Sequence, residues 1–142
     1  FVSSGYDRPT LYAIKTDGLG DVTDSKIVWK TSKSVPRNSS VVIVNDMLFM
    51  AADNGVVSCL DVNTGSIHWI VRVGGSTSSS LLHAAKKIYL TDETGKTFVF
   101  KAGKKFEEIA SNDLGERTLA SLMAWGETLV IRTEKAIYRF GK

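Results

Sequence analysis

The chain has little cysteine, little proline and no strong excess of either charge. Its 142 residues include one cysteine, Cys59, which excludes an internal disulfide and any metal site built from several thiolates. We interpret Cys59 as a buried, unreactive thiol and not as a nucleophile. The sequence contains no run of about 18 apolar residues, so it predicts no membrane-spanning helix.

Charge of the two signs is mixed along the chain. There are 18 Lys and Arg against 15 Asp and Glu, and the densest basic stretch, 96–105, is followed at once by Glu107 and Glu108. A nucleic-acid-binding face would carry charge of one sign with aromatic residues between the charges. We therefore expect a solvated rim here and no nucleic-acid partner.

Short strands are the dominant local signal. Apolar and β-branched runs of four to eight residues alternate with clusters of Gly, Asn, Asp and Ser, and no stretch favours a long helix. The predicted strands cover residues 1–4, 11–14, 27–30, 41–44, 47–52, 56–60, 67–71, 81–82, 88–90, 97–100, 106–110, 119–125, 129–132 and 136–140.

Similar sequence recurs about every 40 residues, which is typical of propeller blades built from short strands. Trp29 precedes Trp69 by 40 residues, Gly55 precedes Gly95 by 40, and the serine-rich segment 38–42 is echoed at 78–82. We predict an all-β fold, a partial β-propeller of about three and a half four-stranded antiparallel blades. It forms one domain over residues 1–142, with blade one at 1–33, blade two at 34–73, blade three at 74–114 and blade four at 115–142.

The most specific motif is Cys59-x-Asp61-x-x-Thr64-Gly65-x-x-x-Trp69. Asp61 and Thr64 are spaced to hydrogen-bond a tight turn, and Gly65 supplies the backbone freedom that closes it. Trp69 ends an outer strand, where its ring can pack on the adjacent blade. Its indole N–H then needs an acceptor, and we expect a backbone carbonyl of that blade.

This motif resembles the tryptophan-docking motif of pyrroloquinoline-quinone-type (quinoprotein-like) propellers, Ala-x-Asp-x-x-Thr-Gly-Lys-x-x-Trp. Cys59 stands in place of the alanine and Ser66 in place of the lysine. Blade one keeps Ala13 and Trp29 around a longer loop, and blade three has Ile109 near the tryptophan position.

Residues 127–142 are similar to the last strands of bacterial outer-membrane-assembly-type propeller scaffolds. This resemblance implies a non-catalytic scaffold that binds protein partners in the periplasm or cell envelope of a bacterium. It implies no cofactor, and we assign no catalytic, cofactor-binding or metal-binding residue.

Two alternative functions stay open. One is a fragment of a quinone-dependent alcohol or sugar dehydrogenase. Such enzymes use a vicinal disulfide, a calcium ion and an aspartate base, none of which can be assigned in this sequence. The other is a carbohydrate-binding propeller in which Trp125 and Tyr138 stack on sugars.

The remaining candidate ligands have simpler explanations. Residues 17–24 hold three carboxylates and two glycines that could wrap a calcium ion, but Leu19 stands where an EF-type loop needs a ligand. We interpret the segment as an extended hairpin loop. His68 and His83 are isolated in the sequence, and we expect surface or packing roles for both.

Known propellers have about four to eight blades, so this chain predicts an unclosed ring. Either it is the C-terminal portion of a longer propeller, which we favour, or copies assemble to complete the ring. Because the chain begins with Phe1 and not Met, we expect that an N-terminal piece has been removed. Blades one and four would expose apolar faces, so we predict self-association.

Overall fold

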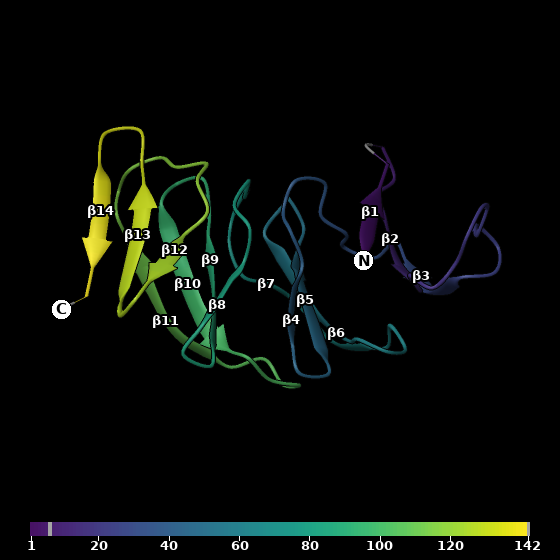
Figure 1. The fold of residues 1–142 in the computed structure, drawn as a ribbon. Coiled ribbons are helices and arrows are strands. Elements are labelled where there is room, and N and C mark those ends of the chain that lie inside the picture. Colours follow the sequence, from purple (N-terminus) through teal and green to yellow (C-terminus); the bar gives the residue numbers. More distant parts are fainter. Residues whose placement is uncertain (6, 142) are drawn as a thin grey trace.

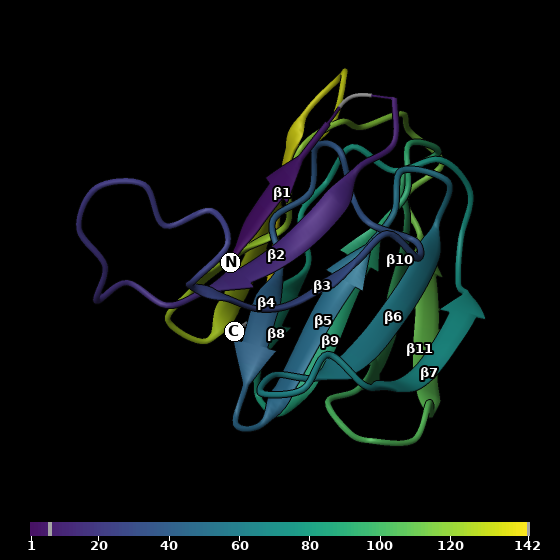
Figure 2. The ribbon, with the colours of Figure 1, turned by 90° about the vertical axis from the view of Figure 1, so that its right-hand side faces the viewer.

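In a computed structural model, which describes residues 1–5 and 7–141, the chain forms four antiparallel sheets and no helix. The sheets follow one another in a row in the order of the sequence, with the two termini at opposite ends (Figure 1). Viewed along the row, the sheets lie one behind the other (Figure 2). The arrangement confirms the predicted all-β partial propeller.

Blades two and three each hold a complete four-stranded sheet whose strand order follows the sequence. The strands of blade two are β4 (Val42–Val44), β5 (Met47–Ala51), β6 (Val56–Asp61) and β7 (Ile67–Arg72). Those of blade three are β8 (Leu82–Ala84), β9 (Lys87–Thr91), β10 (Lys96–Lys101) and β11 (Glu108–Asp113).

Blades one and four have three strands each among the described residues. Blade one consists of β1 (Val2–Ser4), β2 (Thr10–Ile14) and β3 (Ile27–Thr31), and blade four of β12 (Met123–Trp125), β13 (Thr128–Arg132) and β14 (Ile137–Phe140). Because β2 and β3 carry Ala13 and Trp29 as a cross-strand pair, they correspond to the two outermost strands of a full blade. Within residues 1–5 and 7–141, blade one therefore has no equivalent of the innermost strand, and blade four has none of the outermost one.

Two predicted strands differ from the structure by more residues than the others do. The strand expected at 119–125 is only β12, Met123–Trp125, because the preceding residues form a linker whose Ser121 hydroxyl accepts the Ser80 N–H at 2.9 Å. The strand expected at 106–110 is β11, Glu108–Asp113, which begins after a longer turn.

A bulge recurs in the outer hairpin of the first three blades. Ala13 pairs with Trp29, Cys59 with Trp69 and Val99 with Ala110, and in each case the register shifts directly after the pair. The outer strand thus has two residues opposite one. The tryptophan position of blade three is therefore held by Ala110 and not by Ile109, which the spacing in the sequence had suggested.

The hydrophobic core lies between neighbouring sheets. Every residue of β5 is buried because this strand has a blade on each side. Its alternate residues Met47, Phe49 and Ala51 join the cluster shared with blade three, whereas Leu48 and Met50 join the cluster shared with blade one. We call each of these contacts a seam and number it by its two blades.

The repeated serines join successive blades. The Ser39 hydroxyl donates to the Ser79 carbonyl at 2.6 Å, and the Ser40 N–H donates to the Ser80 hydroxyl at 3.0 Å. These partners are 40 residues apart, so equivalent positions of adjacent blades contact each other directly.

Candidate functional site: the seams between blades

The turn between β6 and β7 is organised by one carboxylate. Oδ1 of Asp61 accepts the Asn63 N–H at 3.0 Å, the Thr64 N–H at 2.9 Å and the Thr64 hydroxyl at 3.1 Å. Gly65 closes the turn at φ 71°, and its N–H donates to the Asp61 carbonyl at 2.9 Å. These hydrogen bonds, led by the one from the Thr64 backbone, hold the pKa of Asp61 below its ordinary value of 3.8.

We expect the change Asp61→Asn to lower stability at neutral pH and to matter less in acid. A carboxyl whose pKa is depressed in the folded state adds stability above its unfolded pKa, and that stability is lost as the pH falls through the folded pKa. Urea unfolding from pH 7 to about pH 2 should show the two proteins converging below about pH 4. A stability difference that does not change with pH would contradict this role of the charge.

Trp69 bridges seam 2–3. Its ring comes from β7 and is half-buried, and Nε1 donates to the Gly103 carbonyl in the β10–β11 turn at 3.0 Å. The rings of Phe49, Phe100 and Phe106 surround it at centroid distances of 6.0, 6.0 and 5.2 Å. The aromatic cluster thus combines side chains of both blades.

Trp29 makes the equivalent contact in seam 1–2. Its Nε1 donates to the Val62 carbonyl in the β6–β7 turn at 3.1 Å. A Cβ on Gly65 would lie 2.7 Å from the Trp29 ring, so the glycine also leaves room for that ring. The motif alone does not predict this second role of Gly65, because Trp29 lies in another blade. The structure places Ala13 buried, opposite Trp29 on β2.

Cys59 lies opposite Trp69 on β6 and has no exposed surface. Burial raises the pKa of its thiol to about 12. We expect no reaction of Cys59 with a thiol-specific reagent at pH 8 in the folded protein, and full reaction in denaturant. Absorbance after adding a disulfide reagent would measure both, and rapid modification of the folded protein would contradict the assignment as an inert packing group.

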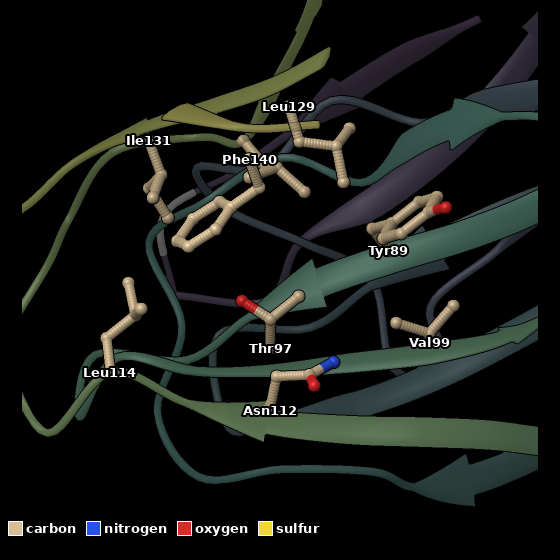
Figure 3. A pocket seen from close by; sticks show the side chains of 9 residues that line it. Tyr89, Thr97, Val99, Asn112, Leu114, Leu129, Ile131 and Phe140 are labelled. Atoms are coloured by element: carbon tan, nitrogen blue, oxygen red, sulfur yellow. The ribbon is translucent and has the colours of Figure 1, made fainter. Parts of the chain in front are cut away.

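Seam 3–4 lacks an indole and contains a cavity of about 280 Å³. Figure 3 shows its walls. The side contributed by blade four is apolar, with Leu122, Leu129, Ile131 and Phe140, whereas blade three contributes the apolar Val99 and Leu114 together with polar groups. These polar side chains are Tyr89, Thr97 and Asn112. No feature of the sequence taken in isolation pointed to this cavity.

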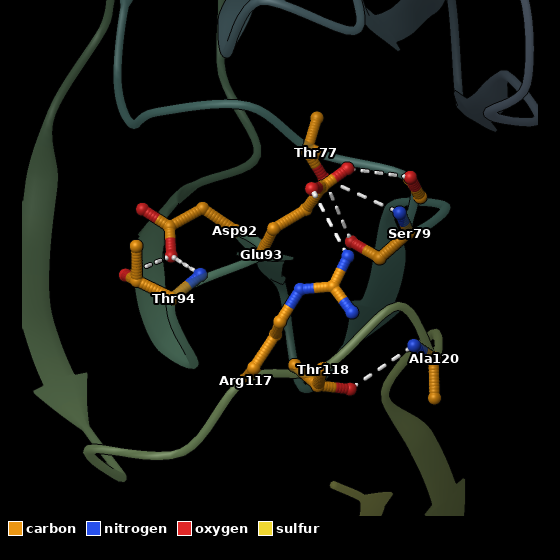
Figure 4. Close-up of polar contacts among 9 residues, drawn as sticks. Thr77, Ser79, Asp92, Glu93, Thr94, Arg117, Thr118 and Ala120 are labelled. Carbon is orange, nitrogen blue, oxygen red and sulfur yellow. Dashed lines mark hydrogen bonds and ion pairs between the residues drawn. The ribbon is translucent and has the colours of Figure 1, made fainter. Parts of the chain in front are cut away.

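A cluster of polar side chains lies where the linkers between blades pass over the turns between strands (Figure 4). Oδ1 of Asp92 accepts the Thr94 N–H at 3.0 Å and the Thr94 hydroxyl at 2.6 Å. Glu93 accepts the Ser78 hydroxyl at 2.7 Å and has the Arg117 guanidinium at 4.0 Å. The Asp92 carboxylate therefore organises its own turn, whereas Glu93 connects that turn to the linker at Ser78 and to blade four at Arg117.

Two of the three carboxylates of residues 17–24 have local partners. Asp17 pairs with Lys26 at 3.0 Å, Asp21 accepts the Thr23 N–H at 3.0 Å, and Leu19 is 98% exposed. Over residues 1–5 and 7–141, no three His, Cys, Asp or Glu side chains come close enough together to hold a metal ion. The same residues include no helix that is long and apolar enough to cross a bilayer.

The two aromatic residues considered for sugar stacking lie on opposite faces of blade four. Trp125 pairs with Thr128, whereas Tyr138 pairs with Ile131, and these two positions of β13 point to opposite sides of the sheet. The Tyr138 hydroxyl donates to Glu116 at 2.8 Å, a bond that raises the pKa of Tyr138. Hydrogen bonds from Thr133 and then from Tyr138 lower the pKa of Glu116. One sugar cannot stack on both rings.

Comparison with known proteins shows that other proteins share this architecture. The sequence profile of a family described as outer membrane protein assembly factor BamB matches residues 18–135. The crystal structure of BamB from Moraxella catarrhalis is similar with a TM-score of 0.66 and 19% identity, over 80% of this chain and 36% of that one. The chain thus spans only 36% of that protein's length.

Two further solved structures share the fold. A europium-containing methanol dehydrogenase has a TM-score of 0.59 and 18% identity, over 78% of this chain and 22% of that one. The computationally designed Ika8 protein has a TM-score of 0.59 and 13% identity, over 70% of this chain and 31% of that one. At such identities the likeness concerns architecture and not activity. A search of curated protein sequences returned no significant match.

Proposed function

The chain belongs to the family of the outer membrane protein assembly factor BamB, and from this membership we propose that it is a non-catalytic scaffold that binds protein partners in the bacterial cell envelope. The family match over residues 18–135 is the observation that carries the proposal. Four stacked sheets, with an indole in each of seams 1–2 and 2–3, support it, because they hold loops and outer faces in fixed positions.

The outward face of blade four is the surface that we assign to this role. Met123, Val130 and Arg139 lie side by side on that face in the register of the sheet, and Trp125 and Ile137 share it. Trp125 is 72% exposed and Ile137 is 73% exposed. An apolar face of this kind, with arginines beside it, is typical of a surface that another polypeptide covers.

Cross-linking tests this assignment. A photoreactive amino acid at position 125, introduced in the bacterium that encodes the chain, should link it to an envelope protein or to further blades of the same propeller. Position 19, which is 98% exposed in a loop far from this face, is the matched control. Equal labelling from both positions, or none from position 125, would remove the support for this face.

When no other polypeptide is present, we propose that a second copy covers the exposed faces of blades one and four. In blade one, the exposed apolar residues include Val2, Val28 and Ile14, which are 52%, 51% and 38% exposed. Light scattering should therefore detect dimers or larger species, and Trp125→Glu together with Ile137→Glu should shift the protein toward monomer. A monodisperse monomer of the unmodified chain at micromolar concentration would reject self-association.

Quinone-dependent alcohol oxidation is the alternative that needs a direct test, because a methanol dehydrogenase shares the fold. The residues described here do not fit a quinone and metal site, since they bring no cluster of metal ligands together. We assign no residue to that cofactor. Dye-coupled oxidation of an alcohol after addition of the quinone and calcium would, if it showed turnover, replace the scaffold proposal.

A further inference from the structure

We propose that seam 3–4 binds a small planar aromatic molecule, of the size of indole and with a hydrogen-bonding group on its edge. The chain itself supplies the precedent, because the equivalent space in seam 2–3 is filled by the indole of Trp69 between three phenylalanine rings. The inference does not depend on the proposed scaffold function.

Equivalent positions of blades two and three show how the cavity arises. Phe49, Cys59 and Trp69 form one cross-strand row in blade two, and Ala51, Val57 and Val71 form the next. The corresponding rows of blade three consist of Tyr89, Val99 and Ala110, and of Thr91, Thr97 and Asn112. The seam has therefore lost its indole and, at the same time, has gained polar groups at four positions that are apolar in blade two.

Seam 3–4 holds a space of useful size next to the equivalents of the residues that contact Trp69. A cavity of about 150 Å³ with apolar walls is large enough to bind benzene. The 280 Å³ of seam 3–4 therefore admits a two-ring aromatic molecule. Ile131 is 2% exposed and Leu122 is 8% exposed, whereas Phe140 is 43% exposed, so this wall is an apolar surface, partly open to solvent, against which a flat ring can pack.

The polar wall provides the orienting groups. Thr97 is already bonded to Thr91, with 2.8 Å between their hydroxyl oxygens. Within the described part of the chain, no hydrogen bond engages the amide of the exposed Asn112 or the hydroxyl of the half-buried Tyr89, and both side chains line the cavity (Figure 3). The amide offers both a donor and an acceptor, and the hydroxyl offers the same. These groups suit the N–H or O–H of a heteroaromatic or phenolic ring.

Titration of the protein with indole, followed by NMR of the backbone amides, tests the proposal. We expect saturable shifts at Val99, Ala110 and Leu129, with Phe49 and Cys59 in seam 2–3 unchanged. Absence of saturable shifts at seam 3–4 up to millimolar indole would overturn the proposal. Shifts that appear only with a tryptophan-containing peptide would also overturn it, because the natural occupant would then be a side chain of another polypeptide.

Substitutions at the seam separate binding from folding. Ala110→Trp restores the residue of blade two and should lower the affinity for indole about tenfold or more while the protein stays folded. Ser111→Trp, on the same strand but on the opposite face, is the matched control and should bind as the parent does.

If Ala110→Trp fails to fold, Asn112→Val supplies a second test, since valine is the blade-two residue at this position. This substitution should weaken the binding of indole about fivefold or more. It should leave the binding of naphthalene, which has no hydrogen-bonding group, unaffected. Unchanged indole binding in Asn112→Val would overturn the role assigned to the polar wall.

Discussion

Replacing Trp69 by alanine is expected to lower the free energy of unfolding by about 3 kcal/mol. This value is at the lower end of the range for removing a large aromatic side chain, because the ring is only half-buried. The change deletes the ring that contacts Phe49, Phe100 and Phe106 and leaves a cavity in seam 2–3. It also leaves the Gly103 carbonyl without the indole N–H that it accepts at 3.0 Å.

Urea unfolding followed by circular dichroism measures this effect without relying on tryptophan emission. Leu19→Ala is the control, because that side chain is 98% exposed, lies outside the faces proposed to associate and should change stability by about 0.5 kcal/mol or less. If the two alanine variants were equally stable, the seam would not be the principal source of cohesion between blades two and three.

The second large effect is expected from Gly55→Ala, which should cost about 2–5 kcal/mol. Gly55 has φ +77°, a conformation that disfavours any residue with a Cβ. A Cβ here would also overlap the carbonyl oxygens of Gly74 and Gly75. These atoms cannot easily withdraw, because the Gly55 carbonyl accepts the Val73 and Gly74 N–H groups at 3.0 and 3.3 Å.

Gly115→Ala separates the cost of the backbone conformation from the cost of crowding by the linker to blade three. Gly115 has φ +64°, but a Cβ there would meet nothing within 4 Å, so this variant should show only the backbone cost of about 1–2 kcal/mol. Thermal melting of both variants gives the comparison. Equal losses would show that crowding against the linker to blade three contributes nothing.

The stacking of blades explains why the substitutions at Trp69 and Gly55 are both expected to have large effects. Each blade is a small sheet that is only marginally stable in isolation, so most of its apolar surface must be buried against a neighbour. Trp69 acts within such a seam, and Gly55 lies where the linker to the next blade crosses its turn. A defect at either position is therefore expected to weaken the stacking of blades more than a defect within one hairpin.

Local chemistry was enough to predict the blades. The strands, the turn built by Asp61, Thr64 and Gly65, and the 40-residue repeat depend on residues within one hairpin, whose backbone preferences act over short distances. An indole N–H in an outer strand also predicts an acceptor in the next blade, since a buried donor without a partner is costly.

The seams could not be predicted in the same way, because they join residues that the hairpins do not bring together. The acceptor of Trp69 is 34 residues away at Gly103, and Gly65 leaves room for Trp29 of another blade. Only the bulge after Val99 shows that Ala110 holds the tryptophan position. The cavity of seam 3–4 lies between side chains of two stacked sheets, and no single segment of the chain encodes it.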